Sequence, residues 1–423
     1  MALRVFLVAC ALLLGLPQCR AVDATESGTH YDAWLECPGG RLRFGLELSD
    51  DPRPQAFLIN GLERIAIPVV EARGADAWLL SMPHYDSTLL VRRRGSGLEG
   101  EWTKVRGPGL ETRMVFGAEL AATAQARDAS GPEPAAPTAS EGASSEPVLG
   151  RWSVAFADSE APAVGVFDAG PSGAVLGTFL TELGDYRFLA GDFDGQQLEL
   201  SCFDGAHAFL FRASLEPDGT LSGDFWSRDT WHETWTAQRD EEAQVANPFE
   251  LSAWTGAVPL ADLAFPDLDG RLRSLDDEAF AGRVRLIQLF GSWCPNCHDE
   301  APYLVELDRR YRARGLSILG LAFELTGDLE RDTRQVQRFK ERYGVEYPIL
   351  VAGIADKQDA SRRFPLLDRV RAYPTTIFLD SAGVVRQVHT GFSGPATGPE
   401  HELLRASFES LIEELLTEEA SDE

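Results

Sequence analysis

Lysine is scarce in this 423-residue sequence, and positive charge as a whole is in short supply. The only lysines are Lys104, Lys340 and Lys357, and none of them follows a glycine. The G-K-[ST] loop that cradles phosphates is therefore absent, and no cofactor is predicted. Lysine and arginine together number 39 against 66 aspartates and glutamates, a formal net charge of −27. Such a surface repels phosphate backbones and anionic membranes, so no nucleic-acid partner is expected.

Long apolar runs are also few. Residues 5–16 form an apolar run that is too short to span a bilayer as a helix. The positively charged Arg4 precedes this run, and the small residues Cys19 and Ala21 follow it. This order predicts a secretory signal peptide over residues 1–21, cleaved after Ala21. We therefore expect a protein that is secreted across the inner membrane and resides in the periplasm. Lipoprotein anchoring at Cys19 is the less favoured alternative, because the preceding Gln18 is not a small residue.

Cysteine is limited to six residues, and those beyond the predicted signal peptide are Cys37, Cys202, Cys294 and Cys297. An oxidising compartment permits disulfides. For Cys37 and Cys202 two alternatives stay open: a disulfide between the two halves of the N-terminal region, or two separately buried thiols. Cys294 and Cys297 have only two residues between them, a spacing that favours redox exchange over a structural bridge.

The composition divides the chain into five parts. After the signal peptide, residues 22–117 are β-rich: residues 41–48 alternate apolar and polar, and turn residues such as Asn60-Gly61 separate short strands. Residues 118–147 are mostly Ala, Pro, Ser, Gly and Glu without an aromatic residue, which predicts a disordered linker or loop. Residues 148–245 return to the β pattern. Residues 246–423 form the last part.

The two β-rich parts have many short strands and no helical stripe, which predicts an all-β sandwich or barrel. The segments 100–102 and 223–226 share a glycine, an acidic residue and a nearby tryptophan, a hint that the two parts are duplicates. A single barrel split by the linker is the alternative. Aromatic residues cluster in the second part: Phe209, Phe211, Trp226, Trp231 and Trp235. We expect them to form the core of the β-rich region rather than a peptide-binding surface.

The last part has the pattern of an α/β domain. Residues 284–290 form an apolar run typical of a buried strand, and residues 301–311 carry an apolar stripe at helical spacing. Further strands are predicted over residues 316–323, 347–351, 377–379 and 384–388, and further helices over residues 329–343 and 402–416. Cys294 and Cys297 thus lie where a strand ends and a helix begins.

That position has chemical consequences. A thiol at a helix N-terminus faces free backbone N–H groups and the positive end of the helix dipole, which favour the thiolate. Cys294, the first and more exposed cysteine, is expected to attack a disulfide, and Cys297 is expected to resolve the mixed disulfide that results. Pro295 suits the first helical turn, where a missing N–H costs nothing.

The segment Trp293-Cys294-Pro295-Asn296-Cys297 resembles the W-C-x-x-C motif of the thioredoxin superfamily, and in particular its TlpA/ResA-like thiol–disulfide oxidoreductases. Pro302 is similar to the proline within the family's active-site helix, Glu300 to an acidic residue near the thiols, and residues 372–380 to the loop and strand with the family's cis-proline. The resemblance covers roughly residues 255–416.

The resemblance implies a thioredoxin-like α/β fold for residues 246–423 and a redox-active disulfide between Cys294 and Cys297. It implies a cis bond before Pro374, and substrate contacts through Trp293 and Tyr373. It further implies a protein-disulfide reductase. Its partners would be disulfide-containing exported proteins and a membrane thiol-transferring reductant that recharges it.

One departure concerns proton transfer. Thioredoxin has a buried acid on the strand before its motif, and the corresponding residue here is Gln288, which cannot titrate. Glu300 and Glu324 are the candidates for a replacement. Glu324 follows a predicted strand at the end where α/β sheets place functional groups, but a surface cap for the next helix is an equal alternative.

Other functions were weighed against this interpretation. A peroxiredoxin-like thiol peroxidase usually has a threonine where this chain has Gly291. A zinc site would need four ligands, and the two cysteines with His298 leave it incomplete. In a third alternative, the β-rich region is the functional part of a binding or scaffold protein.

Overall fold

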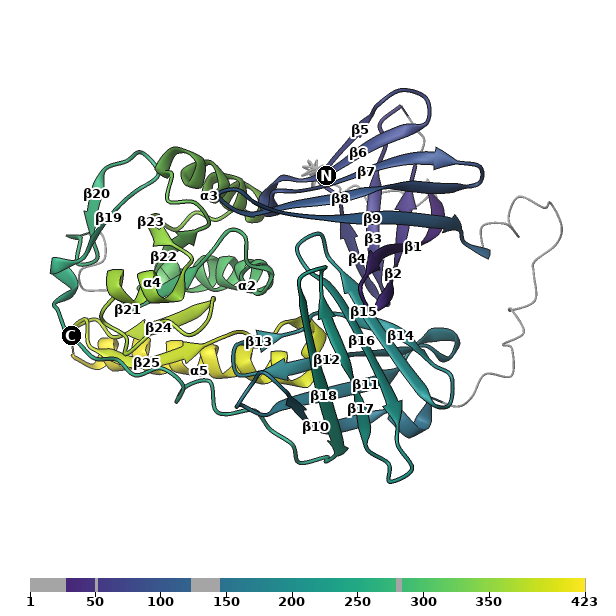
Figure 1. Cartoon of the computed structure of the whole chain (residues 1–423). Helices are drawn as coiled ribbons and strands as arrows, with labels where there is room; N and C mark the ends of the chain where they lie inside the picture. The colour runs from purple at the N-terminus through teal and green to yellow at the C-terminus, as the bar shows by residue number, and fades with distance from the viewer. Residues whose placement is uncertain (1–27, 50–51, 123–144, 279–283, 423) are drawn as a thin grey trace, which may run out of the picture.

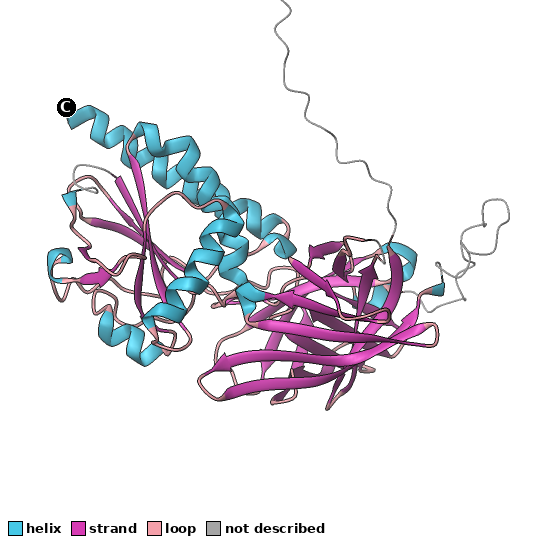
Figure 2. Ribbon diagram, turned by 90° about the horizontal axis from the view of Figure 1, so that it is seen from above, coloured by secondary structure: helices cyan, strands magenta, loops and turns pink. Residues whose placement is uncertain are grey.

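The computed structural model describes residues 28–49, 52–122, 145–278 and 284–422. The predicted signal peptide, with Cys19, and most of the predicted linker lie outside the described residues. Two β units are followed by an α/β unit (Figure 1). Nearly all helix ribbon belongs to the α/β unit (Figure 2). Within the described ranges, no helix is long and apolar enough to cross a membrane.

The first unit is a nine-stranded antiparallel sheet with the order β4-β3-β2-β1-β9-β8-β7-β6-β5. The alternation of residues 41–48 places Leu42, Phe44 and Leu46 on its buried face. Strand β9 continues three residues past the predicted boundary at residue 117. The strands are β1 (Thr29–Cys37), β2 (Gly40–Leu48), β3 (Ala56–Asn60), β4 (Glu63–Ala66), β5 (Val69–Ala72), β6 (Ala77–Met82), β7 (Ser87–Arg94), β8 (Gly97–Gly107) and β9 (Leu110–Leu120).

The second unit is an up-and-down barrel. The ring consists of β10, β11, β12, β14, β15, β16, β17 and β18, each paired with the next, and β10 pairs with β18 to close it. The short β13 pairs with β12 outside the ring. The strands are β10 (Gly150–Phe156), β11 (Ala163–Ala169), β12 (Val175–Thr181), β13 (Gly184–Asp185), β14 (Leu189–Phe193), β15 (Gln197–Phe203), β16 (Ala208–Leu215), β17 (Leu221–Ser227) and β18 (Trp231–Arg239).

The N-terminal region therefore forms two sheets rather than one barrel split by the linker. The segment 100–102 lies on β8 and the segment 223–226 on β17, and each strand is the second-last of its unit. A Cβ atom at Gly100 or Gly223 would overlap a backbone carbonyl of the neighbouring strand, so both positions require glycine for the same reason. The shared topology agrees with the hint of duplication.

Aromatic side chains fill the barrel. Phe211 and Trp235 are 1% exposed, and Phe209 is also buried, in agreement with the predicted core position. Trp226 is half-buried against the core of the first unit. Trp231 is the exception, because 47% of it is exposed at the barrel end. The interior of the barrel is thus occupied by protein.

Cys37 and Cys202 are separately buried free thiols. Cys37 belongs to the core of the first sheet and donates to the carbonyl oxygen of Arg228 at 3.3 Å, whereas Cys202 lies in the barrel core. Burial raises the pKa of both thiols. The alternative of a disulfide between them is therefore not realised in this structure.

The α/β unit has a five-stranded sheet with the order β23-β22-β21-β24-β25. Strands β21, β22 and β23 are parallel, whereas β24 and β25 are antiparallel to their neighbours. The strands are β21 (Val284–Phe290), β22 (Leu316–Glu324), β23 (Ile349–Ile354), β24 (Thr375–Leu379) and β25 (Val385–Thr390). A hairpin of β19 (Ala264–Pro266) and β20 (Leu272–Ser274) precedes them. Every residue of β21 is buried, as an apolar parallel strand requires.

The helices of this unit are α2 (Pro295–Tyr311), α3 (Leu329–Tyr343), α4 (Lys357–Arg363) and α5 (Pro399–Asp422). Helix α3 has the predicted bounds because Asp328 caps its N-terminus and Gly344, at φ 63°, ends it. Helix α5 buries Leu404, Phe408 and Ile412 against the sheet. The sequence analysis missed α4, which is too short for an apolar stripe.

All three units are in contact. Phe203 of β15 packs into the core of the first sheet, with its ring centroid 4.7 Å from that of Phe44. The short helix η1 (Pro83–Tyr85) of the first unit reaches the α/β unit, where the ring of Tyr85 lies 4.6 Å from that of His298. Both β units thereby approach the start of helix α2.

Candidate active site

The two neighbouring cysteines lie where β21 ends and α2 begins. Cys294 is the N-cap residue of α2, and Pro295 is the first helical residue. The backbone N–H of Cys294 donates to the carbonyl of Gly291 at 3.1 Å, and the N–H of His298 donates to the carbonyl of Cys294 at the same distance. These bonds fix the first cysteine at the tip of the helix and the second on its first turn.

The two sulfurs have different surroundings. Cys294 is 6% exposed, and its thiol donates to the carbonyl oxygen of Tyr373 at 3.3 Å; Cys297 is fully buried. Burial raises the pKa of the Cys297 thiol well above its usual value, and the neighbouring Cys294 raises it further. The bond between Tyr373 and Pro374 is cis. Of the two sulfurs, Cys294 is the one an incoming disulfide can reach.

Glu300 lies one turn after Cys297 and is fully buried. It accepts hydrogen bonds from the Thr376 hydroxyl at 2.8 Å and from the Gln288 amide. Burial raises the pKa of Glu300 to about 7, although both hydrogen bonds act to lower it. The carboxyl group thus sits beside Gln288, the residue that replaces the buried acid of thioredoxin, and can hold or release a proton near neutral pH.

Glu324 is also buried, at the end of β22. It accepts from the backbone N–H of Ser292 at 2.8 Å and from the Ser292 hydroxyl at 2.6 Å. Burial raises its pKa to about 7. The helix-cap alternative is wrong, because Asp328 caps α3. Glu324 instead holds the loop that precedes the cysteines.

Trp293 is held in the same loop. Its indole N–H donates to the carbonyl of Phe323 at 2.9 Å, and its ring packs edge-on against Tyr373. A Cβ atom at Gly291 would overlap the Trp293 indole. A threonine at that position, as in peroxiredoxin-like peroxidases, is therefore incompatible with this loop.

His298 does not point toward a metal-binding cluster. Its two ring nitrogens lie 2.7 Å from the Tyr343 hydroxyl and 2.7 Å from the Ser292 carbonyl. Burial lowers its pKa well below the usual value, so the ring is neutral. No group of three or more His, Cys, Asp or Glu side chains suited to a metal occurs in the described ranges.

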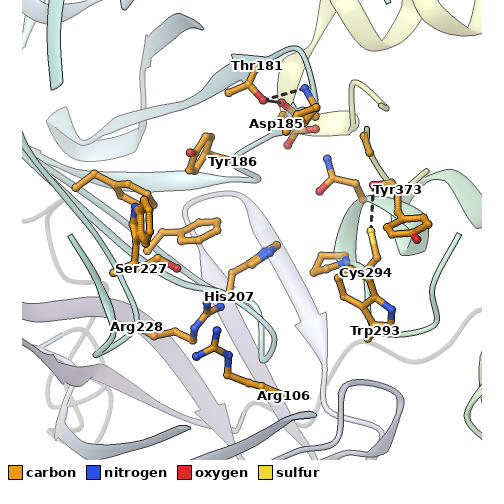
Figure 3. A pocket seen from close by; sticks show the side chains of 18 of the residues that line it. Arg106, Thr181, Asp185, Tyr186, His207, Ser227, Arg228, Trp293, Cys294 and Tyr373 are labelled. Carbon is orange, nitrogen blue, oxygen red and sulfur yellow. Dashed lines mark hydrogen bonds between the residues drawn. The ribbon is translucent and has the colours of Figure 1, made fainter. Parts of the chain in front are cut away.

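Cys294 opens into a cavity of about 660 Å³ between the units (Figure 3). Trp293, Cys294 and Tyr373 lie on one side of it, and Tyr186, His207 and Arg228 of the barrel unit lie on the other. Arg106 of β8 adds a wall from the first sheet. The cavity is of the size that binds small ligands or short peptide segments. An incoming disulfide meets both β units before it meets the thiol.

A buried arginine of the barrel unit joins the three units next to the cysteines. The Arg187 guanidinium lies 2.9 Å from Glu63 of β4 and 3.4 Å from Asp204, and it also pairs with Asp299 of α2. Burial alone would lower the pKa of Arg187, but Glu63 and Asp204 raise it above its usual value. The charged arginine thus fixes both β units on the active-site helix.

A second contact fixes the tip of the barrel. Asp185 accepts from the backbone N–H groups of Arg187 and Gly394, each at 2.7 Å. A Cβ atom at Gly184 would overlap the amide of Asn296, one of the two residues between the cysteines. None of these barrel residues was singled out in the sequence analysis, because they are more than a hundred residues from the cysteines and form no motif.

The strand order, the cis-proline loop and the cysteine pair at the start of a helix define a thioredoxin-like domain. Residues 254–404 match the Redoxin family. The chain is 30% identical over 130 residues to the thioredoxin-like protein YneN of Bacillus subtilis, and this alignment covers 31% of this chain and 68% of YneN. It is 31% identical over 132 residues to the thiol–disulfide oxidoreductase ResA of Geobacillus thermodenitrificans, and this alignment covers 31% of this chain and 66% of ResA. The chain belongs to this ResA-like family of the thioredoxin superfamily.

Solved structures of similar proteins come from the same superfamily. A thioredoxin-family thiol:disulfide interchange protein from Chlorobium tepidum is 22% identical and has a TM-score of 0.28, with 38% of this chain and 99% of that chain covered. The curated relatives each align with about a third of this chain.

Proposed function

We propose that the protein is a thiol–disulfide oxidoreductase that reduces disulfides of exported proteins through Cys294 and Cys297. The observation that carries the proposal is the position of the Cys294 sulfur, beside the Tyr373 carbonyl and at the wall of a cavity large enough for a peptide segment. The membership of the ResA-like family supports the same chemistry.

The reaction proceeds by two exchanges. The Cys294 thiolate attacks one sulfur of the substrate disulfide, which forms a mixed disulfide and releases the other sulfur as a thiolate. Cys297 then loses its proton and attacks the Cys294 sulfur, which forms the Cys294–Cys297 disulfide and releases the second substrate thiolate. Both thiolates take up protons, so the substrate gains two electrons and two protons. A membrane thiol-transferring partner restores the dithiol.

Glu300 is the proposed proton acceptor for Cys297. The raised pKa of Cys297 means that its proton must be removed before it can attack. A carboxylate whose pKa is about 7 matches neutral conditions, where a general base is most effective. Trp293 and Tyr373 are proposed to contact the substrate from the cavity wall, and the backbone before Pro374 to receive it.

The direction of electron flow is tested by the reduction potential of the full chain in thiol–disulfide buffers. A reductase is expected near the thioredoxin value of about −270 mV. Strong oxidants lie near about −120 mV, a difference worth roughly 7 kcal/mol for two electrons. A value at the oxidising end would reverse the proposed direction, and a pair that does not titrate at all would remove the function.

The β units are proposed to take part in this function rather than to act as a separate scaffold. The cavity in front of Cys294 has walls from β8, from the barrel unit and from the α/β unit. Binding of a substrate at the thiol would therefore involve all three. We also propose export to the periplasm, on the ground of the signal-like N-terminal sequence alone.

A further inference from the structure

Positive charges gather in the cavity in front of Cys294. Arg106, Arg228 and Lys357 line it, and no carboxylate of the described residues lies within salt-bridge distance of any of the three. Acidic residues outnumber basic ones 66 to 39 in this chain. By contrast, Arg113 on the outside of the first sheet pairs with both Glu101 and Glu111.

The two arginines are held close to one another. Figure 3 shows their guanidinium groups side by side below His207. Burial and the nearby charge of Arg106 together lower the pKa of Arg228 to about 10, although Asp229 acts to raise it. The Nε atom of Arg228 has no hydrogen-bond partner in the described part of the chain. Among the residues that the structure describes, the Arg106 guanidinium donates a hydrogen bond only to the Thr230 hydroxyl, at 3.5 Å. An anion between the two arginines would relieve this repulsion.

The third cation lies on the thiol side of the cavity. Lys357 is the first residue of α4. Burial lowers its pKa, and a negative charge on Cys294 raises it, so its ammonium group is within electrostatic reach of the attacking sulfur. The aromatic side chains of Tyr186, Phe209 and Phe225 from the barrel unit also line the cavity.

The acidic residues of the cavity wall already have partners. Glu233 accepts from the indole N–H of Trp231 at 3.1 Å and from the backbone N–H of Asp158 at 3.2 Å. Asp185 accepts from two backbone N–H groups. The wall thus offers a ligand three cations without a salt bridge to a described carboxylate, together with apolar side chains and the hydroxyl groups of Ser227 and Thr230.

We propose that this cavity binds a flexible, acidic peptide segment that carries a disulfide-bonded cysteine. Its carboxylates pair with Arg106 and Arg228 while its disulfide lies against Cys294, near Lys357. The inference rests on the proposed function and names its substrate class. The chemistry is the exchange already described: the dithiol of the protein supplies two electrons, and the peptide leaves as a free thiol with its former disulfide partner.

The test uses two synthetic peptides that differ only in the residues around a single cysteine, four glutamates in one and four lysines in the other. In each, the cysteine forms a disulfide with 2-mercaptoethanol. The reduced full-length protein is mixed with either peptide in excess, and tryptophan fluorescence follows the oxidation. We expect the acidic peptide to react at least about ten times faster than the lysine peptide.

The variant R106Q/R228Q is expected to bring this ratio close to one, and K357Q to reduce it. The control R94Q/R113Q removes two arginines of the first sheet that are paired with carboxylates, and it should keep the ratio. Because both peptides meet the same thiols, a general loss of reactivity or stability cancels in the ratio. A high ratio that survives in R106Q/R228Q would overturn the assignment to these residues.

Two further substrates separate the possible failures. If the wild-type protein reduces neutral 2-hydroxyethyl disulfide but treats the peptides alike, the acidic-peptide inference is wrong while the proposed function stands. If it reduces neither the neutral disulfide nor the peptides, the proposed function itself is wrong. If oxidised glutathione alone shows a rate that depends on Arg106 and Arg228, the cavity selects small anionic disulfides, and the peptide proposal is overturned.

Discussion

Arg187 of the barrel unit forms an ion pair with Asp299, which follows Cys297 by two residues in helix α2. The same guanidinium lies 2.9 Å from Glu63 in the first sheet. A single side chain therefore connects two β units to the redox helix. This contact is one of several that join the β units to the α/β unit, and the cavity in front of Cys294 has walls from all three units.

Removal of Arg187 should destabilise the protein strongly. The substitution R187M removes the guanidinium from the buried Asp204 and from the partly buried Glu63 and Asp299. Loss of one partner of a buried pair typically costs about 3–5 kcal/mol. The loss of stability is measured as the change in the free energy of unfolding in urea at pH 7. The control is R94Q, which breaks the exposed ion pair between Arg94 and Glu99 and should cost at most about 1 kcal/mol. A loss for R187M no greater than that of R94Q would contradict this role.

Stability should depend on pH through Glu300. Its folded pKa of about 7 lies above its ordinary value of 4.5, so the folded state binds the proton more tightly. The stabilisation is complete below pH 4.5 and is lost as the pH rises through 7, by up to about 3 kcal/mol. Urea unfolding of the wild type and of E300Q from pH 4 to 8 should show this loss in the difference between them. Parallel curves would show that Glu300 is not titrating in this range.

Exchange should depend on the same carboxyl group. In E300Q the group cannot accept the proton of Cys297, so the second exchange step slows while the first does not. Single-turnover kinetics from pH 5 to 9 should show a rate inflection near pH 7 for release of the second thiol in the wild type. The variant should lack it. An unchanged profile would remove Glu300 from the mechanism.

The loop before the cysteines should depend on Glu324. The substitution E324A leaves the buried N–H and hydroxyl of Ser292 without their acceptor, which costs about 1–3 kcal/mol. E324Q retains an acceptor for the N–H and should cost less. Hydrogen exchange at the Ser292 amide checks the cause: its protection should fall in E324A and persist in E324Q. Equal protection in the two variants would argue against this contact.

The roles of the two cysteines should separate by substitution. In C297S the mixed disulfide on Cys294 cannot be resolved and should accumulate as a covalent adduct with a peptide disulfide. In C294S the remaining thiol is fully buried, so no adduct is expected. Mass spectrometry of the intact chain after non-reducing quenching measures both. Adducts on C294S but not on C297S would exchange the two roles.

The α/β unit could be predicted closely because its signals are local. The apolar run 284–290 is β21, residues 329–343 are α3, and the cysteines lie at the predicted strand–helix junction. The β units show the limit of this approach. Alternating residues predict strands, yet they do not say which strands pair, and so a single barrel and two sheets were equally compatible with the sequence.

The sequence by itself determined where the two cysteines lie, because a strand pattern before them and a helix pattern after them are both local. Only the tertiary structure decided what faces those cysteines. Barrel closure pairs β10 with β18 across some eighty residues of chain, and it presents Arg187, Asp185 and Arg228 to the helix that begins at Pro295. Such contacts depend on long-range packing and charge pairing between units, which no local pattern of residues encodes.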